Sequence, residues 1–228
     1  MQGATEPRAR WTPGPRLAAA LAFAAERHGD QARKGSSDPY ATHLLAVSAM
    51  VIEHGGTEDQ AIAALLHDVV EDTGATYEEL AGFGPTVVAI VRACTDATSQ
   101  EKASRSLTWR QRKERYIAHL RATPPGDPYP LVALADKTHN AETSARELAG
   151  GLARGQFFAR FNSDPESQRW YFGSLIAAFS SLTLDDGARR LLARLERAVT
   201  TMFPEDWGTV PSRQTRPTDA CYSQIPSR

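Results

Sequence analysis

The chain has 228 residues, which is enough for one sizeable domain with its own core and short for two. Hydrophobic residues make up 41% of it and charged residues 23%, the composition of an ordinary globular protein. The formal net charge of −1 excludes a global field that would draw the chain onto nucleic acid or a membrane. Binding to nucleic acid would therefore need a local basic patch.

Cysteine usage and the first residues predict a cytoplasmic location. Cys94 lies in an apolar run and Cys221 in a polar stretch near the end, a pair that suggests no structural disulfide and fits a reducing cytosol. The first 16 residues lack the apolar core of a signal peptide. No apolar run reaches the roughly 20 residues that a membrane-spanning helix needs. We therefore expect a cytoplasmic protein with no membrane partner.

Helical periodicity covers most of the chain and predicts an all-α fold of about nine helices. Capping-box patterns mark helix starts at Thr57, Thr76 and Thr108, each with Glu or Gln three residues later. The β-branched run in 84–96 has no partner strand nearby, so we interpret it as a buried helix, and the polar segment after it as a loop. The expected helices span residues 13–30, 38–56, 57–74, 76–80, 84–96, 108–122, 127–150, 164–182 and 184–203.

The domain organisation follows from the same pattern. Residues 14–203 are expected to form a single helical domain, preceded by an N-terminal extension of residues 1–13. Residues 204–228 are rich in Pro, Ser and Thr with little periodicity, which indicates a loosely ordered tail. The sequence does not indicate the oligomeric state.

The stretch "AALLHDVVEDT" places four polar side chains in the helix expected at 57–74. At 100° per residue, His67, Asp68, Glu71 and Asp72 fall on the half of that helix opposite its leucines. On amphipathicity alone, the solvated side of a surface helix is the more frequent explanation. However, three carboxylates without an adjacent Lys or Arg would repel one another unless a cation intervened.

Two residues elsewhere favour a site over a solvated face. His43 lies in the apolar helix expected before this one; by itself it would more often be a core histidine than a ligand. Asp136 interrupts the apolar run of "LVALADKTHN", where a buried carboxylate must be ion-paired, hydrogen-bonded or bound to a metal. The set His43, His67, Asp68 and Asp136 offers two imidazoles and two carboxylates. That mixture suits a divalent transition metal such as Mn, Fe or Co, with coordination positions left open.

With these residues assembled, the chain resembles the HD-domain metal-dependent phosphohydrolases, whose signature is His, then His-Asp, then Asp. It is similar in particular to the hydrolase domain of the RelA/SpoT alarmone enzymes and, in size, to the mesh-type small alarmone hydrolases. The similarity runs from about Leu17 to Leu182. It is carried by the blocks "HGDQARKGSSDPYATH", "AALLHDVVEDT", "FGPTVVAIVRACTD" and "LADKTHN", in that order.

The resemblance implies a single HD-domain helical bundle that removes the 3′-pyrophosphate of guanosine tetra- or pentaphosphate, giving GDP or GTP and pyrophosphate. It implies His43, His67, Asp68 and Asp136 as ligands of Mn²⁺, other divalent transition metals being alternatives. Catalysis would fall to Glu71 and Asp72, which orient and deprotonate the attacking water. The implied substrate-binding residues are Arg33, Lys34, Lys137 and Asn140. Lys102 is added as a candidate because it belongs to a basic cluster in the polar segment that could line the phosphate entrance.

Some of these assignments have plain alternatives. Arg33 and Lys34 taken alone would be surface charges, and Asn140 a helix-surface amide. Lys102 opens a basic stretch that could equally be solvated. The chain also departs from the family at Glu142, where relatives carry Arg, so a charge is reversed near the expected nucleotide site.

The sequence supports three hypotheses about the function. The favoured one is an alarmone 3′-pyrophosphohydrolase. Its substrates could extend to adenosine analogues, and it could serve as antitoxin to a toxic alarmone synthetase or act on tRNA 3′ ends. The second is a broader HD phosphatase acting on nucleoside monophosphates or NADPH. The third is a non-catalytic antitoxin or binding module, which would be expected to lack a ligand or the Glu71–Asp72 pair, and neither is missing.

Overall fold

The computed structural model describes residues 11–104 and 107–204, and within them the predicted all-α class is confirmed. The only strand-like pairing in this part of the chain is an isolated bridge between Ala32 and Pro39. The helices are α1 (Pro15–His28), α2 (Ala41–Glu53), α3 (Glu58–Leu66), α4 (Val69–Asp72), the 3₁₀ helix η1 (Ala81–Phe83), α5 (Pro85–Cys94), α6 (Ser99–Ser104), α7 (Trp109–Arg121), α8 (Tyr129–Ala149), α9 (Arg154–Phe158), α10 (Pro165–Ser180) and α11 (Asp186–Met202).

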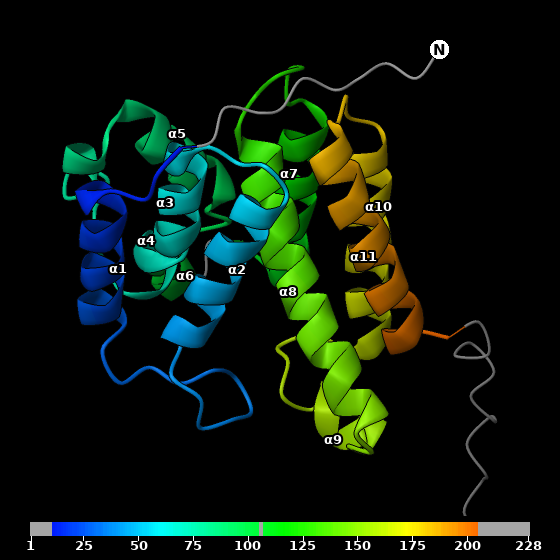
Figure 1. The fold of residues 1–228 in the computed structure, drawn as a ribbon. Coiled ribbons are helices and arrows are strands. Elements are labelled where there is room, and N and C mark those ends of the chain that lie inside the picture. Colours follow the sequence, from blue (N-terminus) through cyan, green and yellow to red (C-terminus); the bar gives the residue numbers. More distant parts are fainter. Residues whose placement is uncertain (1–10, 105–106, 205–228) are drawn as a thin grey trace, which may run out of the picture.

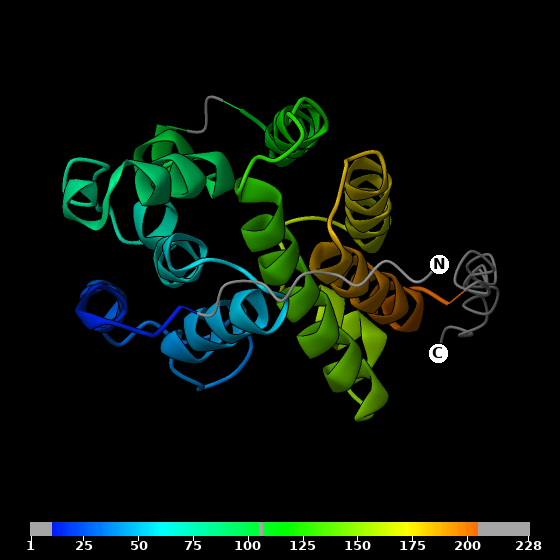
Figure 2. The ribbon, with the colours of Figure 1, turned by 45° about the horizontal axis from the view of Figure 1, so that its top comes forward.

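The 21-residue helix α8 is the central element of the fold. Helices α1 to α6 lie on one side of it, and α10 and α11 on the other (Figures 1 and 2). It packs against α2, α3 and α5 on the first side and against α11 on the second. Residues 131–136, in its N-terminal half, are all buried, because both sides of this segment are covered. A polar residue in that half must therefore find its partners inside the protein.

Local sequence patterns account for several helix boundaries. Thr57 and Thr108 each form the predicted capping box, with Gln60 and Gln111 bonding back to the cap. The segment 84–96 is a helix over Pro85–Cys94, as predicted, and buries Val87, Ile90 and Val91 against the core.

Three short elements differ from the sequence prediction. Residues 76–80 form a turn and not a helix, and the 3₁₀ helix η1 follows. The cap hydrogen bonds between Thr76 and Glu79 are present, but Gly82, Gly84 and Pro85 follow closely and prevent a longer helix. The polar segment expected to be a loop contains α6, and α9 was not expected. Both helices have six residues or fewer, which is too short for a periodic pattern to be recognised.

Both ends of the chain extend beyond the described residues, and the expected tail lies there except for its first residue, Pro204. Within the expected N-terminal extension, Trp11 is half-buried and donates a hydrogen bond from Nε1 to the carbonyl of Gly56 at 2.9 Å. Cys94 is a buried thiol, and Cys221 lies outside the described part. Among the described helices none combines the length and the apolar character that crossing a bilayer would require.

Replacing each of two helical glycines with alanine is expected to change the stability of the protein in opposite directions. A Cβ at Gly187, in the first turn of α11, would lie 1.9 Å from the backbone oxygen of His54, so G187A should destabilise the protein by about 2 kcal/mol through overpacking. Gly173 is exposed on α10 with open space around its Cβ position, so G173A should stabilise by up to about 1 kcal/mol. Urea unfolding of the two variants and the parent checks both signs. A destabilised G173A or a neutral G187A would contradict the packing described here.

Candidate metal and catalytic site

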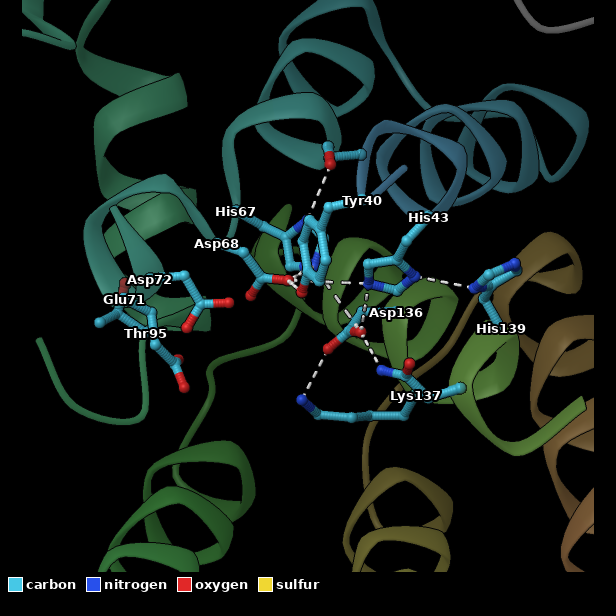
Figure 3. A network of polar contacts seen from close by, with 12 residues as sticks. Tyr40, His43, His67, Asp68, Glu71, Asp72, Thr95, Asp136, Lys137 and His139 are labelled. Carbon is cyan, nitrogen blue, oxygen red and sulfur yellow. Dashed lines mark hydrogen bonds and ion pairs between the residues drawn. The ribbon is translucent and has the colours of Figure 1, made fainter. Parts of the chain in front are cut away.

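Four side chains from three segments of the fold meet beside α8. His43 comes from α2, His67 follows the end of α3, Asp68 precedes α4, and Asp136 lies on α8. Figure 3 shows these four side chains pointing toward one another. His43 Nε2 lies 3.2 Å from Asp136 Oδ1 and 3.7 Å from Asp68 Oδ2. His67 Nε2 lies 3.0 Å from Asp68 Oδ2 and 3.6 Å from Asp136 Oδ1. The structure therefore brings together all four residues that the sequence suggested as ligands.

A break in the backbone lets two consecutive residues share this centre. The prediction of one continuous helix over 57–74 is wrong, because α3 ends at Leu66 and α4 begins at Val69. The carbonyl of Ala64, which the Asp68 N–H would reach in a continuous helix, accepts a hydrogen bond from His67 Nδ1 at 2.8 Å. Side chains of adjacent helical residues point about 100° apart. The interruption therefore allows His67 and Asp68 to face the same point.

The imidazole nitrogens at the centre have no hydrogen-bond partner. Nε2 of His43 and Nε2 of His67 are both buried and unsatisfied, although carboxylate oxygens lie nearby. A carbonyl can only accept, so His67 carries its proton on Nδ1, and in the neutral ring Nε2 keeps a lone pair directed at the cluster. Buried nitrogens of this kind are normally satisfied, and a cation between them and the carboxylates would satisfy them.

The electrostatics of the cluster favour a positive charge at its centre. Burial by itself would lower the pKa of His67, but the Asp68 and Asp136 carboxylates raise it well above its ordinary value. Burial would raise the pKa of Asp136, but Lys137 and the two imidazoles lower it well below its usual range. Burial lowers the pKa of His43. Two ionised carboxylates beside two imidazoles therefore form a site that attracts a cation.

The donor set fits a divalent metal ion. One ligand atom each from His43, His67 and Asp68 lie within 4.8 Å of one another, and Asp136 Oδ1 is close to both imidazoles. Mixed nitrogen and oxygen ligands suit divalent transition metals. Tyr40 donates a hydrogen bond from its hydroxyl to Asp68 Oδ2 at 2.5 Å, which orients that carboxylate in the way that groups around a metal site commonly do.

The second pair of acidic residues lies beside the cluster and not within it (Figure 3). Lys102 Nζ is 2.9 Å from both Glu71 Oε1 and Asp72 Oδ1. Glu71 Oε2 also accepts a hydrogen bond from the backbone N–H of Asp96 at 3.2 Å. Burial, together with the Asp68 carboxylate, raises the pKa of Glu71, while Lys102 opposes the rise. A carboxylate with a raised pKa next to a metal site is suited to accept a proton near neutral pH.

A cavity of about 450 Å³ adjoins the cluster. Its walls contain cations from several elements, namely Arg33, Lys34, Lys113, Lys137 and Arg160, and aromatic rings including Tyr40, Trp109, Tyr171 and Phe172. Among the described residues neither Arg33 nor Lys34 forms an ion pair; Arg33 donates to the Asn140 amide and Lys34 lies over the Phe161 ring. Two cations without a neutralising carboxylate therefore face this cavity, where an anion could bind them.

Asn140 and Lys137 connect the cavity to the cluster. Asn140 donates from Nδ2 to Asp136 Oδ1 at 2.6 Å and accepts at Oδ1 from Arg33 Nη2 at 2.9 Å. Lys137 bonds its own neighbour, with Nζ 2.6 Å from Asp136 Oδ2. Adjacent residues on a helix do not face each other, but the four-carbon stem of lysine is long enough to fold back. The predicted substrate residues thus lie along this cavity, except Lys102, which contacts Glu71 and Asp72.

Glu142 is directed away from the cavity. Arg194 on α11 binds it with two hydrogen bonds, Nε to Oε1 and Nη2 to Oε2, both at 2.9 Å. The reversed charge is therefore paired across the α8–α11 interface and does not line the cavity.

Two residues of the site were missed by sequence reasoning. Tyr40 holds Asp68, and His139 contacts the back of His43, with the two Nδ1 atoms 2.7 Å apart. Burial, and then the neighbouring His43, lower the pKa of His139 to about 4. The signal for both was spacing: each lies three residues from a predicted ligand, His43 or Asp136, and such residues share a helix face.

Residues 20–154 match the family model described as an HD domain, which is more than half of the chain. The chain belongs to the HD domain family. Members of this family bind divalent metals, and the His43–His67–Asp68 group with Asp136 is the place in the described residues that fits one.

Relatives within the family are alarmone hydrolases by name. The chain is 40% identical over 124 residues to guanosine-3′,5′-bis(diphosphate) 3′-pyrophosphohydrolase MESH1 of Danio rerio, covering 52% of this chain and 63% of that one. It is 35% identical over 133 residues to the bifunctional (p)ppGpp synthase/hydrolase SpoT of Escherichia coli, covering 56% and 18%. The matched segment thus spans less than two thirds of each of these relatives.

A solved structure matches over more of the chain. It is described as a metazoan ortholog of SpoT that hydrolyzes ppGpp, and it is 29% identical with a TM-score of 0.60. The match covers 85% of this chain and 97% of that one. The arrangement of helices in this chain is therefore similar to that of this solved protein.

Proposed function

We propose that the protein is a metal-dependent hydrolase that removes the 3′-pyrophosphate from (p)ppGpp, releasing GDP or GTP and pyrophosphate. One observation carries the proposal: two buried imidazole nitrogens that form no hydrogen bond converge on two carboxylates. They lie at the edge of a cavity where two cations, Arg33 and Lys34, have no ion-pair partner among the described residues. The first half of that arrangement suits a divalent metal, and the second suits a ligand with several negative charges.

His43, His67, Asp68 and Asp136 would hold the metal, for which we propose Mn²⁺ or another divalent transition metal. When bound, such a metal lowers the pKa of water and offsets phosphate charge. Glu71 would accept a proton from the attacking water, and Asp72 would orient that water. Water attacks the phosphorus attached to the 3′ oxygen, that P–O bond breaks, and the nucleotide leaves with a 3′-hydroxyl. Positioning and charge compensation dominate phosphoryl transfer, so the chain needs no nucleophile of its own.

The cavity would bind the nucleotide. Arg33 and Lys34 would bind its phosphates, Lys137 and Asn140 would contact phosphate and ribose near the metal, and Lys102 would keep its place beside the catalytic pair. Trp109 lies at a wall of the same cavity, in edge-to-face contact with Tyr171, where a flat base could pack. The pairing of Glu142 with Arg194 removes the charge conflict that the sequence suggested. Adenosine analogues would fit the same scheme.

Partners beyond a free nucleotide follow from the same chemistry. A tRNA 3′ end that carries a pyrophosphate presents the same ester as the alarmone. If the protein hydrolysed that ester, or the alarmone made by a toxic synthetase, it would act as an antitoxin through its enzymatic activity. The alternative enzyme is a broader HD phosphatase for nucleoside monophosphates or NADPH. A purely non-catalytic antitoxin is disfavoured by the completeness of the ligand set and of the Glu71–Asp72 pair.

The deciding experiment uses guanosine tetraphosphate labelled in its 3′-pyrophosphate, incubated with the purified full chain and Mn²⁺, then with excess chelator. We expect labelled pyrophosphate to be released with Mn²⁺ and not with chelator. Release of inorganic phosphate, or turnover of NADPH or a nucleoside monophosphate in its place, would select the broader phosphatase. No release from a protein that binds Mn²⁺ would overturn the enzymatic proposal.

A further inference from the structure

His139 lies directly behind His43, on the opposite side of that ring from the carboxylates (Figure 3). The two Nδ1 atoms are 2.7 Å apart, a hydrogen-bond distance, and the ring centroids are 4.9 Å apart. His43 is fully buried. The hydrogen bond that its ring forms within the described residues is to a second imidazole, and that partner influences where the ring proton resides.

The proton of His43 has two alternative positions. If it were on Nε2, that N–H would point into the cluster and His43 could not bind a cation there. Nε2 lies 3.2 Å from Asp136 Oδ1, an ion-pair distance, but the contact does not meet the geometry of a hydrogen bond, so Asp136 is a poorly aligned acceptor for this tautomer. If the proton is on Nδ1, His43 donates to His139 Nδ1 and Nε2 has a free lone pair. The 2.7 Å contact satisfies this second tautomer.

We propose that His139 is a positioning residue that accepts a hydrogen bond from His43 Nδ1–H and thereby keeps the Nε2 lone pair of His43 directed at the metal. Metal-binding histidines generally need such an acceptor on their other nitrogen. His67 has one in the carbonyl of Ala64. His43 has no comparable backbone partner in the described residues, and a side chain on α8 supplies the acceptor instead.

The geometry of α8 explains why position 139 can do this. Asp136 and His139 are three residues apart, so they lie on the same face of α8, which packs against α2. One helix thus provides a ligand and the support for a ligand on its neighbour. His139 needs only an acceptor atom two bonds beyond Cβ, at the position of Nδ1. Asparagine has Oδ1 at that position and leucine has a methyl group there.

This difference defines the test, which rests on the proposed metal site and not on the proposed substrate. Mn²⁺ affinity is measured by titration calorimetry for the parent chain and for H139L, H139N and H119L, with circular dichroism to check folding. We expect H139L to bind Mn²⁺ about 10- to 100-fold more weakly. H139N should bind close to the parent. H119L, which removes an exposed imidazole on α7, should not change the affinity.

Two results would overturn the inference. One is that H139L binds Mn²⁺ as tightly as the parent chain does. The other is that H139N binds Mn²⁺ as weakly as H139L does, which would mean that packing of the ring matters and the acceptor atom does not. If H139L does not fold, ¹⁵N NMR of the histidines in the parent chain decides. Finding the His43 proton on Nε2 would overturn the inference, and finding it on Nδ1 would support it. A parent that binds no Mn²⁺ would overturn both the metal site and this role. A parent that binds Mn²⁺ but does not release pyrophosphate would overturn only the proposed function.

Discussion

Replacing Glu71 with glutamine is expected to reduce hydrolysis by about 100- to 10,000-fold while leaving Mn²⁺ affinity unchanged. Glu71 lies beside the metal cluster and is not part of the group of residues able to hold an ion. Its carboxylate is held by Lys102 and by the backbone N–H of Asp96, which fix its position. Glutamine retains the shape of the side chain but cannot accept a proton, so the loss would fall on turnover and not on folding or metal binding.

The measurement is the rate of pyrophosphate release at saturating substrate, together with Mn²⁺ titration of the same preparation. E78Q is a matched control, since Glu78 is an exposed glutamate whose loss should change neither quantity. If E71Q hydrolysed normally, Glu71 would not be the base. If it lost Mn²⁺ instead, Glu71 would be a ligand and the division of roles between Asp68 and Glu71 would be wrong.

The replacement of Asp136 with asparagine is expected to abolish both Mn²⁺ binding and hydrolysis and to destabilise the fold. Asp136 is 6% exposed and interacts with four groups: the two imidazoles, Lys137 Nζ and the Asn140 amide. An uncharged amide removes the negative charge that attracts the cation and leaves Lys137 without its counter-ion. Losing a buried, charge-assisted hydrogen bond typically costs about 1–3 kcal/mol, so the melting temperature should fall as well.

A control on the same helix separates the site from general stability. E142Q also removes a carboxylate of α8 from an ion pair, here with Arg194, but away from the cavity. It should lower the melting temperature slightly and leave Mn²⁺ affinity and turnover intact. Full activity in D136N, or loss of Mn²⁺ binding in E142Q, would contradict the arrangement of the site.

Sequence patterns were most reliable where the determinants are local. Capping residues such as Thr57 and Thr108 act within one turn of the chain, and apolar spacing identifies the buried face of each long helix. The same kind of pattern was misleading at Thr76, where the cap bonds form but residues 76–80 are a turn and not an α-helix. It was also misleading at His67, whose ring binds a backbone carbonyl and interrupts a helix that periodicity predicts to be continuous.

The sequence by itself determined the helical class, most of the long helices and the four residues of the candidate metal site, because residue type and spacing along the chain carry that information. It could not determine the partners of Glu142 and His43, which are Arg194 and His139, 52 and 96 residues away. Nor could it show that Lys137 folds back onto Asp136. Only the packing of α2, α8 and α11 decided those contacts, because a side chain between packed helices bonds whichever polar group the neighbouring helix presents to it.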